Sequence, residues 1–177
     1  MSAREPPTPR ATEAILAATA LVTVCVTLLF ELMRPDSDVD ASFAAGFLWL
    51  FSALFLLRVV GQLVARELAP DWLPPTQAWN LTPYRLLLPV QLGILALMAW
   101  IDIDLSREAG YWADPKPRFG EALRWFAYVY AAVMAARYVV RMRRNPDQRW
   151  FGGAIPIVFH WVLAAYLYVL GSFHASY

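Results

Sequence analysis

The sequence predicts an all-α integral membrane protein, a compact bundle of five transmembrane helices. Hydrophobic residues make up 59% of the 177 residues, and the mean hydropathy is +0.44. Charged residues amount to 16%, whereas a soluble domain carries roughly a quarter. The apolar residues form five runs, at about 11–32, 41–64, 83–103, 119–142 and 153–171. Each run has about 18–24 residues, enough to cross a hydrocarbon core about 30 Å thick.

Aromatic residues also indicate a membrane protein. They make up 15% of the chain and include eight Trp. Many of the Trp residues stand where an apolar run meets a polar segment, namely Trp72, Trp79, Trp100, Trp112 and Trp150. Amphipathic rings are enriched at both membrane–water interfaces, so this distribution is typical of interfacial anchors. We expect one transmembrane domain over residues 11–171 and no soluble domain.

The first run follows a proline-rich tail, residues 1–10, that contains Arg4 and Arg10. A basic tail before an apolar run is also typical of a signal peptide, but a signal peptide has an apolar region of only ~7–15 residues. The residues from Glu31 to Asp36 contain no small-x-small cleavage site. We therefore predict an uncleaved spanning helix.

The second and third helices have recognisable ends. Pro35 ends the first helix, and the second runs over about 41–64. Thr82 can cap the third helix, and Pro83 suits its first helical position. Pro89 lies inside the third helix and lacks a backbone donor, so we expect a kink there.

The fourth helix, about 119–142, is followed by a basic turn over residues 143–148. The fifth, about 153–171, leads into a short tail over residues 172–177. A bundle of four spans, with the first or the last run lying at the membrane surface, is the alternative architecture.

Basic residues predict the orientation. Five spans put the two termini on opposite sides, with ten basic residues on the side of the N-terminus and five on the other: Arg4, Arg10, Arg58, Arg66, Arg85, Arg137, Arg141, Arg143, Arg144 and Arg149 against Arg34, Arg107, Lys116, Arg118 and Arg124. The positive-inside rule then places the N-terminus in the cytoplasm and residues 172–177 outside. Fourteen of the fifteen basic residues are Arg, as in GC-rich bacterial genomes, so we expect a bacterial inner (cell) membrane.

Polar side chains from four helices share one predicted depth. Residues about seven positions inside the cytoplasmic helix ends lie roughly 10 Å deep. This level carries four donor-rich side chains, Arg58, Gln91, Arg137 and His160, and Gln62 shares a helix face with Arg58. Polar groups inside a membrane are costly and are usually functional. We therefore predict a cationic pocket that binds a lipid, a polyprenyl phosphate or a quinone.

Each of these side chains also has a structural interpretation. Arg58 and Arg137 can extend toward the headgroups at the cytoplasmic surface. Gln91 can bind a backbone carbonyl that Pro89 leaves free. His160 can make a hydrogen bond to a neighbouring helix. The sequence leaves these alternatives open.

Two further groups of charged residues lie near helix ends. At the cytoplasmic end of the fourth run, we expect anionic lipids to contact a cluster formed by Arg141, Arg143 and Arg144. Asp102 and Asp104 stand at the other end of the third run, and we expect them to be exposed capping residues.

Several functional classes are excluded or disfavoured. The sequence contains no HExxH, CxxC, P-loop or GxSxG motif. His174 lies near the outer end, 14 residues after His160, so the pair does not bracket a haem, and the lone Cys25 makes no metal site. A net charge of +1 does not favour nucleic acid as a partner. A transporter or channel is disfavoured because the runs show no inverted repeat.

These observations favour a non-catalytic accessory or structural subunit of a membrane complex, with other membrane subunits and the bilayer as partners. The alternative is a lipid-, polyprenyl-phosphate- or quinone-binding protein, or a small enzyme, that uses the layer around His160. We predict no catalytic residue and no metal, and no cofactor other than a quinone or a bound lipid.

Overall fold

The structure, a computed structural model, describes residues 10–35, 38–68, 84–144 and 155–177 and shows five α-helices among them. They are α1 (Arg10–Met33), α2 (Ala41–Glu67), α3 (Tyr84–Ser106), α4 (Pro117–Arg144) and α5 (Ile155–Ala175). The helices coincide with the five apolar runs, and each extends a few residues beyond most of the expected boundaries. Trp72, Trp79, Thr82, Pro83 and Trp150 lie outside the described residues.

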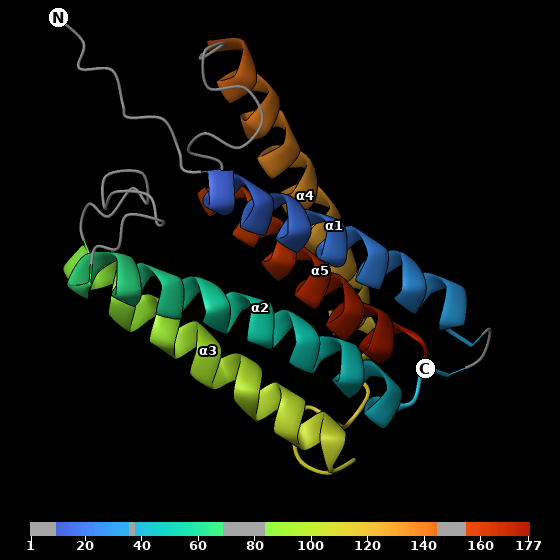
Figure 1. Cartoon of the computed structure of the whole chain (residues 1–177). Coiled ribbons are helices and arrows are strands. Elements are labelled where there is room, and N and C mark those ends of the chain that lie inside the picture. Colours follow the sequence, from blue (N-terminus) through green and yellow to red (C-terminus); the bar gives the residue numbers. More distant parts are fainter. Residues whose placement is uncertain (1–9, 36–37, 69–83, 145–154) are drawn as a thin grey trace, which may run out of the picture.

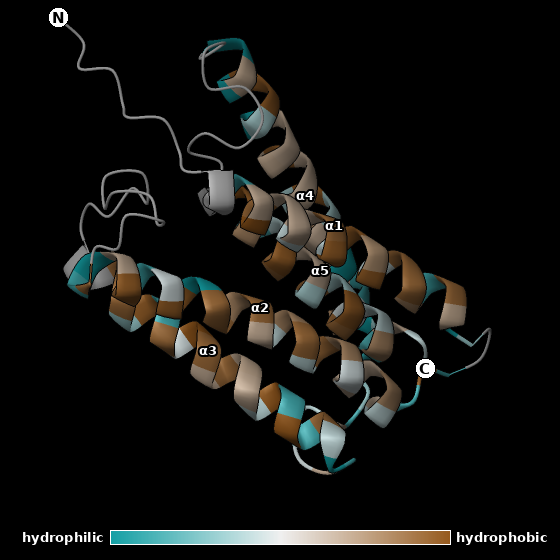
Figure 2. Cartoon of the chain, in the orientation of Figure 1, coloured by the Kyte–Doolittle hydropathy of each residue, from teal (hydrophilic) through white to brown (hydrophobic). Residues whose placement is uncertain are grey.

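Four of these helices, α1, α2, α3 and α5, are long and apolar enough to cross a membrane. Figure 2 shows mostly hydrophobic residues along α1, α2 and α3, with hydrophilic residues toward the helix ends. The exception is α4, which carries seven charged residues in its 28 positions. The structure therefore confirms an all-helical bundle with four apolar helices of spanning length.

The central helix is α5, which packs against α1, α2 and α4, as Figure 1 shows. Its sequence explains this position, because side chains on all its faces are apolar and most are buried, among them Val162, Tyr166, Val169 and Phe173. A helix that is hydrophobic all round belongs in the interior of a bundle. On the outside, α3 packs on α2.

Polar contacts at the end of the bundle where Tyr177 lies fix the connection between α1 and α2. The backbone N–H of Val39 donates to Ser176 Oγ over 3.0 Å, and the Tyr177 hydroxyl donates to the carbonyl of Val39 over 3.3 Å. Val39 itself is fully buried. We call this end the Tyr177 end and the opposite one, where α4 finishes, the Arg144 end.

Close backbone approach joins α4 to α5 near the Tyr177 end. A Cβ atom at Gly120 would overlap the backbone of Gly171 and Ala175, and one at Gly171 would lie 2.9 Å from the backbone nitrogen of Arg124. Both positions therefore need glycine, since only hydrogen leaves room for the facing backbone.

Threonine hydroxyls on α1 are satisfied within their own helix. Thr19, Thr23 and Thr27 each donate to the carbonyl four residues earlier, over 2.7–2.8 Å. This back-bonding lets hydroxyl groups lie on an apolar helix without an unpaired donor. The three residues recur every four positions and so form one stripe along α1.

Candidate functional site

A polar cluster joins α2, α4 and α5 within the bundle. The hydroxyl of Tyr130 and Nδ1 of His160 form a hydrogen bond between α4 and α5. Arg58 on α2 places its guanidinium 5.4 Å from the centre of the Phe159 ring, and its charge also acts on Tyr130 and His160. The charge of Arg137 reaches His160 as well. We call Arg58, Tyr130, Arg137 and His160 the histidine cluster.

The members of the histidine cluster differ in exposure. Only 7% of Arg58 is exposed, so its guanidinium lies among protein side chains and over an aromatic face. His160 and Tyr130 are half-buried, whereas Arg137 is exposed. The hydrogen bond from Tyr130 corresponds to the structural interpretation of His160. It leaves Nε2 as the imidazole nitrogen that can meet a further group.

The two glutamines of the predicted layer belong to neighbouring helices, Gln62 to α2 and Gln91 to α3. Contacts of Ser52 with Asp102 and of Trp49 with Ser106 fix the antiparallel register of α2 and α3. This register puts Gln62 opposite the turn that contains Gln91. Both side chains are buried, and no described residue accepts or donates a hydrogen bond at Gln62 Oε1, Gln62 Nε2 or Gln91 Oε1. Unpaired buried amides are costly, which makes Gln62 and Gln91 a second polar feature of the interior.

Asp102 corrects the sequence-based expectation. Predicted to be an exposed cap, it is fully buried between α2, α3 and α5. Its carboxylate accepts hydrogen bonds from the Ser52 hydroxyl over 2.6 Å and from the Tyr166 hydroxyl over 3.0 Å. The prediction was wrong because α3 continues to Ser106, so Asp102 stands one turn inside the helix. Asp104 lies near the end of α3, where its carboxylate accepts a hydrogen bond from the backbone N–H of Trp112.

The basic cluster of Arg141, Arg143 and Arg144 forms the last turn of α4. Arg143 and Arg144 are exposed and Arg141 is half-buried. In Figure 1 this end of α4 projects beyond the neighbouring helices. Exposed guanidinium groups in this position are suited to contact an anionic surface.

His174 is a buried polar residue that the sequence analysis did not identify as a candidate. It is fully buried near the Tyr177 end, against the rings of Phe119 and Phe173, with centroid distances of 5.5 and 4.9 Å. Neither ring nitrogen has a hydrogen-bond partner among the described residues. Those residues contain no group of three or more His, Cys, Asp or Glu that could hold a metal ion.

Comparisons of the chain with protein-family models, with curated proteins and with solved structures found no match.

Proposed function

We propose that this protein is a multi-pass membrane protein that acts as a non-catalytic accessory or structural subunit of a membrane complex. Four apolar helices of spanning length support the membrane assignment. In this proposal α4 is the fifth span, and the N-terminus lies in the cytoplasm of a bacterial cell. The cluster of Arg141, Arg143 and Arg144 then meets anionic phospholipids of the cytoplasmic leaflet.

The exposed side of α4 is the observation that best supports a partner subunit. Among the described residues, α4 packs only on α5. The side of α4 away from α5 exposes a row of large apolar side chains, Trp125, Phe126, Val129 and Val133, and Arg137 is exposed at the edge of this row. A charged side chain at the centre of a span costs about 2.5–3.5 kcal/mol on insertion scales. A second protein covering this side would therefore stabilise α4 more than lipid does.

Site-specific crosslinking tests the partner. A photo-reactive residue at Val133, which is 53% exposed, should join the protein to one polypeptide of defined mass in intact membranes. The matched control is Leu92 on α3, which is 50% exposed and should give lipid adducts only. Native mass spectrometry in mild detergent should show the same polypeptide at a fixed stoichiometry. A lone chain, with equal lipid adducts from both positions, would rule out the accessory role.

The histidine cluster favours a second candidate function, the binding of a quinone or of a lipid or polyprenyl phosphate. Arg58 and His160 offer donors to a carbonyl or a phosphate oxygen in a low-dielectric setting, where such hydrogen bonds are strong. No carboxylate contacts His160 among the described residues, so an anionic or carbonyl-bearing ligand fits the cluster. Whether the protein is also an enzyme depends on that ligand.

The ligand is tested by mass spectrometry of small molecules that co-purify with the chain. We expect His160→Ala and Arg58→Ala to lower the retained quinone or phosphate lipid about tenfold each, the size of one hydrogen bond to a charged group. Arg118→Ala, an exposed arginine at the Tyr177 end of α4, serves as the control. Wild-type retention in both cluster variants would remove this candidate.

A further inference from the structure

We propose a phospholipid-binding site at the Tyr177 end of the bundle, with the lipid phosphate between Arg34 and Arg124 and an acyl chain in the groove between α1 and α4. Its headgroup pocket lies at the Tyr177 end, whereas the histidine cluster lies nearer the Arg144 end. The inference rests on the proposal that the bundle spans a bilayer, and it does not depend on the accessory role.

A polar pocket of about 270 Å³ supplies the headgroup site. It opens between the end of α1, the start of α4 and the end of α5, and it is lined by Glu31, Arg34, Pro35, Val39, Arg124, Ser172, Ala175 and Ser176. Two of these residues are cationic and one is anionic, so the lining carries one net positive charge. A phosphate diester carries one negative charge and would neutralise it.

Two buried polar groups of this pocket have no partner among the described residues. Ser172 is only 1% exposed, and its hydroxyl makes no hydrogen bond there. The Nε of Arg124 is likewise buried and unpaired. Both are donors, and buried donors are normally satisfied. The oxygen of a bound phosphate would accept from both groups.

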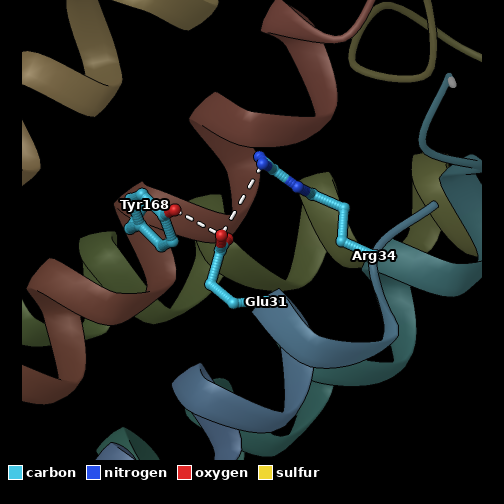
Figure 3. A network of polar contacts seen from close by, with 3 residues as sticks. All are labelled: Glu31, Arg34 and Tyr168. Atoms are coloured by element: carbon cyan, nitrogen blue, oxygen red, sulfur yellow. Dashed lines mark hydrogen bonds and ion pairs between the residues drawn. The ribbon is translucent and has the colours of Figure 1, made fainter. Parts of the chain in front are cut away.

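Glu31 is held in a contact network that leaves the arginines available. As Figure 3 shows, the hydroxyl of Tyr168 donates to Glu31 Oε1 over 2.6 Å, and Arg34 Nη2 lies 3.6 Å from Glu31 Oε2. That ion pair is long and about one-third exposed, so it uses little of the donor capacity of Arg34. Arg124 lies over the Tyr168 ring, 6.0 Å from its centre. Arg34 and Arg124 therefore flank the carboxylate with donors to spare.

An apolar groove of about 370 Å³ adjoins the pocket, and Glu31 lines both. Its floor is a stripe of α5, Trp161, Ala164, Ala165 and Tyr168, and its walls come from α1 and α4. On the α4 side the groove is lined by Ala127 and Ala131, whose small side chains leave space between the helices.

The geometry of the two hollows matches a phospholipid. Together they follow α5 from Trp161 to Ala175, about 21 Å of helix at 1.5 Å per residue. The polar part lies at a helix end, at headgroup level in a spanning bundle, and the apolar part points toward the bilayer centre. A free phosphate ion would use the pocket but not the groove, so the pair of hollows points to a lipid.

The test measures phosphatidylglycerol binding to the full chain in mild detergent by native mass spectrometry, with inorganic phosphate as a second probe. We expect Arg34→Gln combined with Arg124→Gln to lower lipid affinity by more than about tenfold, because at least one hydrogen bond to a charged group is lost. Arg118→Gln, in the first turn of α4 and outside the pocket, should bind as wild type does.

A groove variant separates a lipid from a free anion. Ala131→Phe fills the groove and should weaken lipid binding several-fold, whereas Ala132→Phe, on the exposed side of α4, should not. Melting temperatures of all variants, measured in the same detergent, identify any that unfold, and Ser172→Ala then tests the pocket with a smaller change. If the pocket and groove variants bind the lipid as tightly as the wild type does, the proposed site is wrong. Phosphate binding without lipid binding would overturn the lipid assignment.

Discussion

At the scale of single residues, the buried carboxyl of Asp102 joins two neighbouring helices to its own. It links α3 to Ser52 on α2 and to Tyr166 on α5. Buried polar groups that are fully paired specify one arrangement of their helices, because any slip leaves a donor or acceptor unsatisfied. Asp102 therefore fixes the register of three helices at once.

Replacing Asp102 by Leu should lower the free energy of unfolding by about 1–3 kcal/mol, because two buried hydroxyl donors lose their acceptor. Asp102→Asn keeps an oxygen acceptor and should cost less. Asp114→Asn, at an exposed position of the α3–α4 connection, is the control. Thermal unfolding of purified protein in one detergent measures all three, and equal melting temperatures for Asp102→Leu and the control would contradict the role.

The residue-level predictions from the sequence rested on depth along each helix, which follows from a regular rise of 1.5 Å per residue. In the structure, the charges of Arg58 and Arg137 both act on His160. The rotation of each helix about its own axis depends on packing, which spacing along one chain does not show. For this reason, the sequence did not predict the hydrogen bond between Tyr130 and His160, nor that Gln91 faces α2.

At the scale of helices, the contact of α4 with α5 depends on two glycines. Gly120→Ala should destabilise the protein by about 1–3 kcal/mol, since the added carbon overlaps the backbone of Ala175 and the helices must separate. Gly93→Ala on α3 is the matched control, because a Cβ there meets nothing within 4 Å. That substitution should be neutral or raise stability by up to about 1 kcal/mol through helix propensity.

Thermal unfolding of both glycine variants, again in one detergent, provides the comparison. If Gly120→Ala unfolds at the wild-type temperature, the close approach of α4 and α5 is not needed for stability.

The five helices could be predicted from the sequence, because a run of apolar residues of spanning length is visible without any knowledge of packing. The arginines of α4 show its low hydropathy in the sequence. That α4 packs on α5 and on no other described helix depends on tertiary packing, which the sequence did not reveal.

At the scale of the whole molecule, the alternation of helix direction fixes which connections share an end. The α1–α2 and α3–α4 connections lie at the Tyr177 end, as the contacts of Val39 with Ser176 and of Gly120 with Ala175 show. This grouping follows because each helix runs antiparallel to the one before it, and it was predictable because each connection is short.

Cysteine labelling tests the proposed topology. With Cys25→Ala as background, we expect a cysteine at Ser2 to be labelled by an impermeant maleimide only after the membrane is permeabilised. A cysteine at Tyr177, whose side chain is 49% exposed, should be labelled in intact cells. Labelling of both positions from the same side would contradict five spans.

The central place of α5 has a consequence for biogenesis. The ribosome makes this helix after the other four, yet it supplies the surface on which α1, α2 and α4 pack. In a bundle that spans a membrane, as we propose, the earlier segments would lack this common partner until α5 is inserted and would depend on lipid or insertase contacts. Nascent chains that stall before residue 155 should therefore be recognised by membrane proteases as orphan helices.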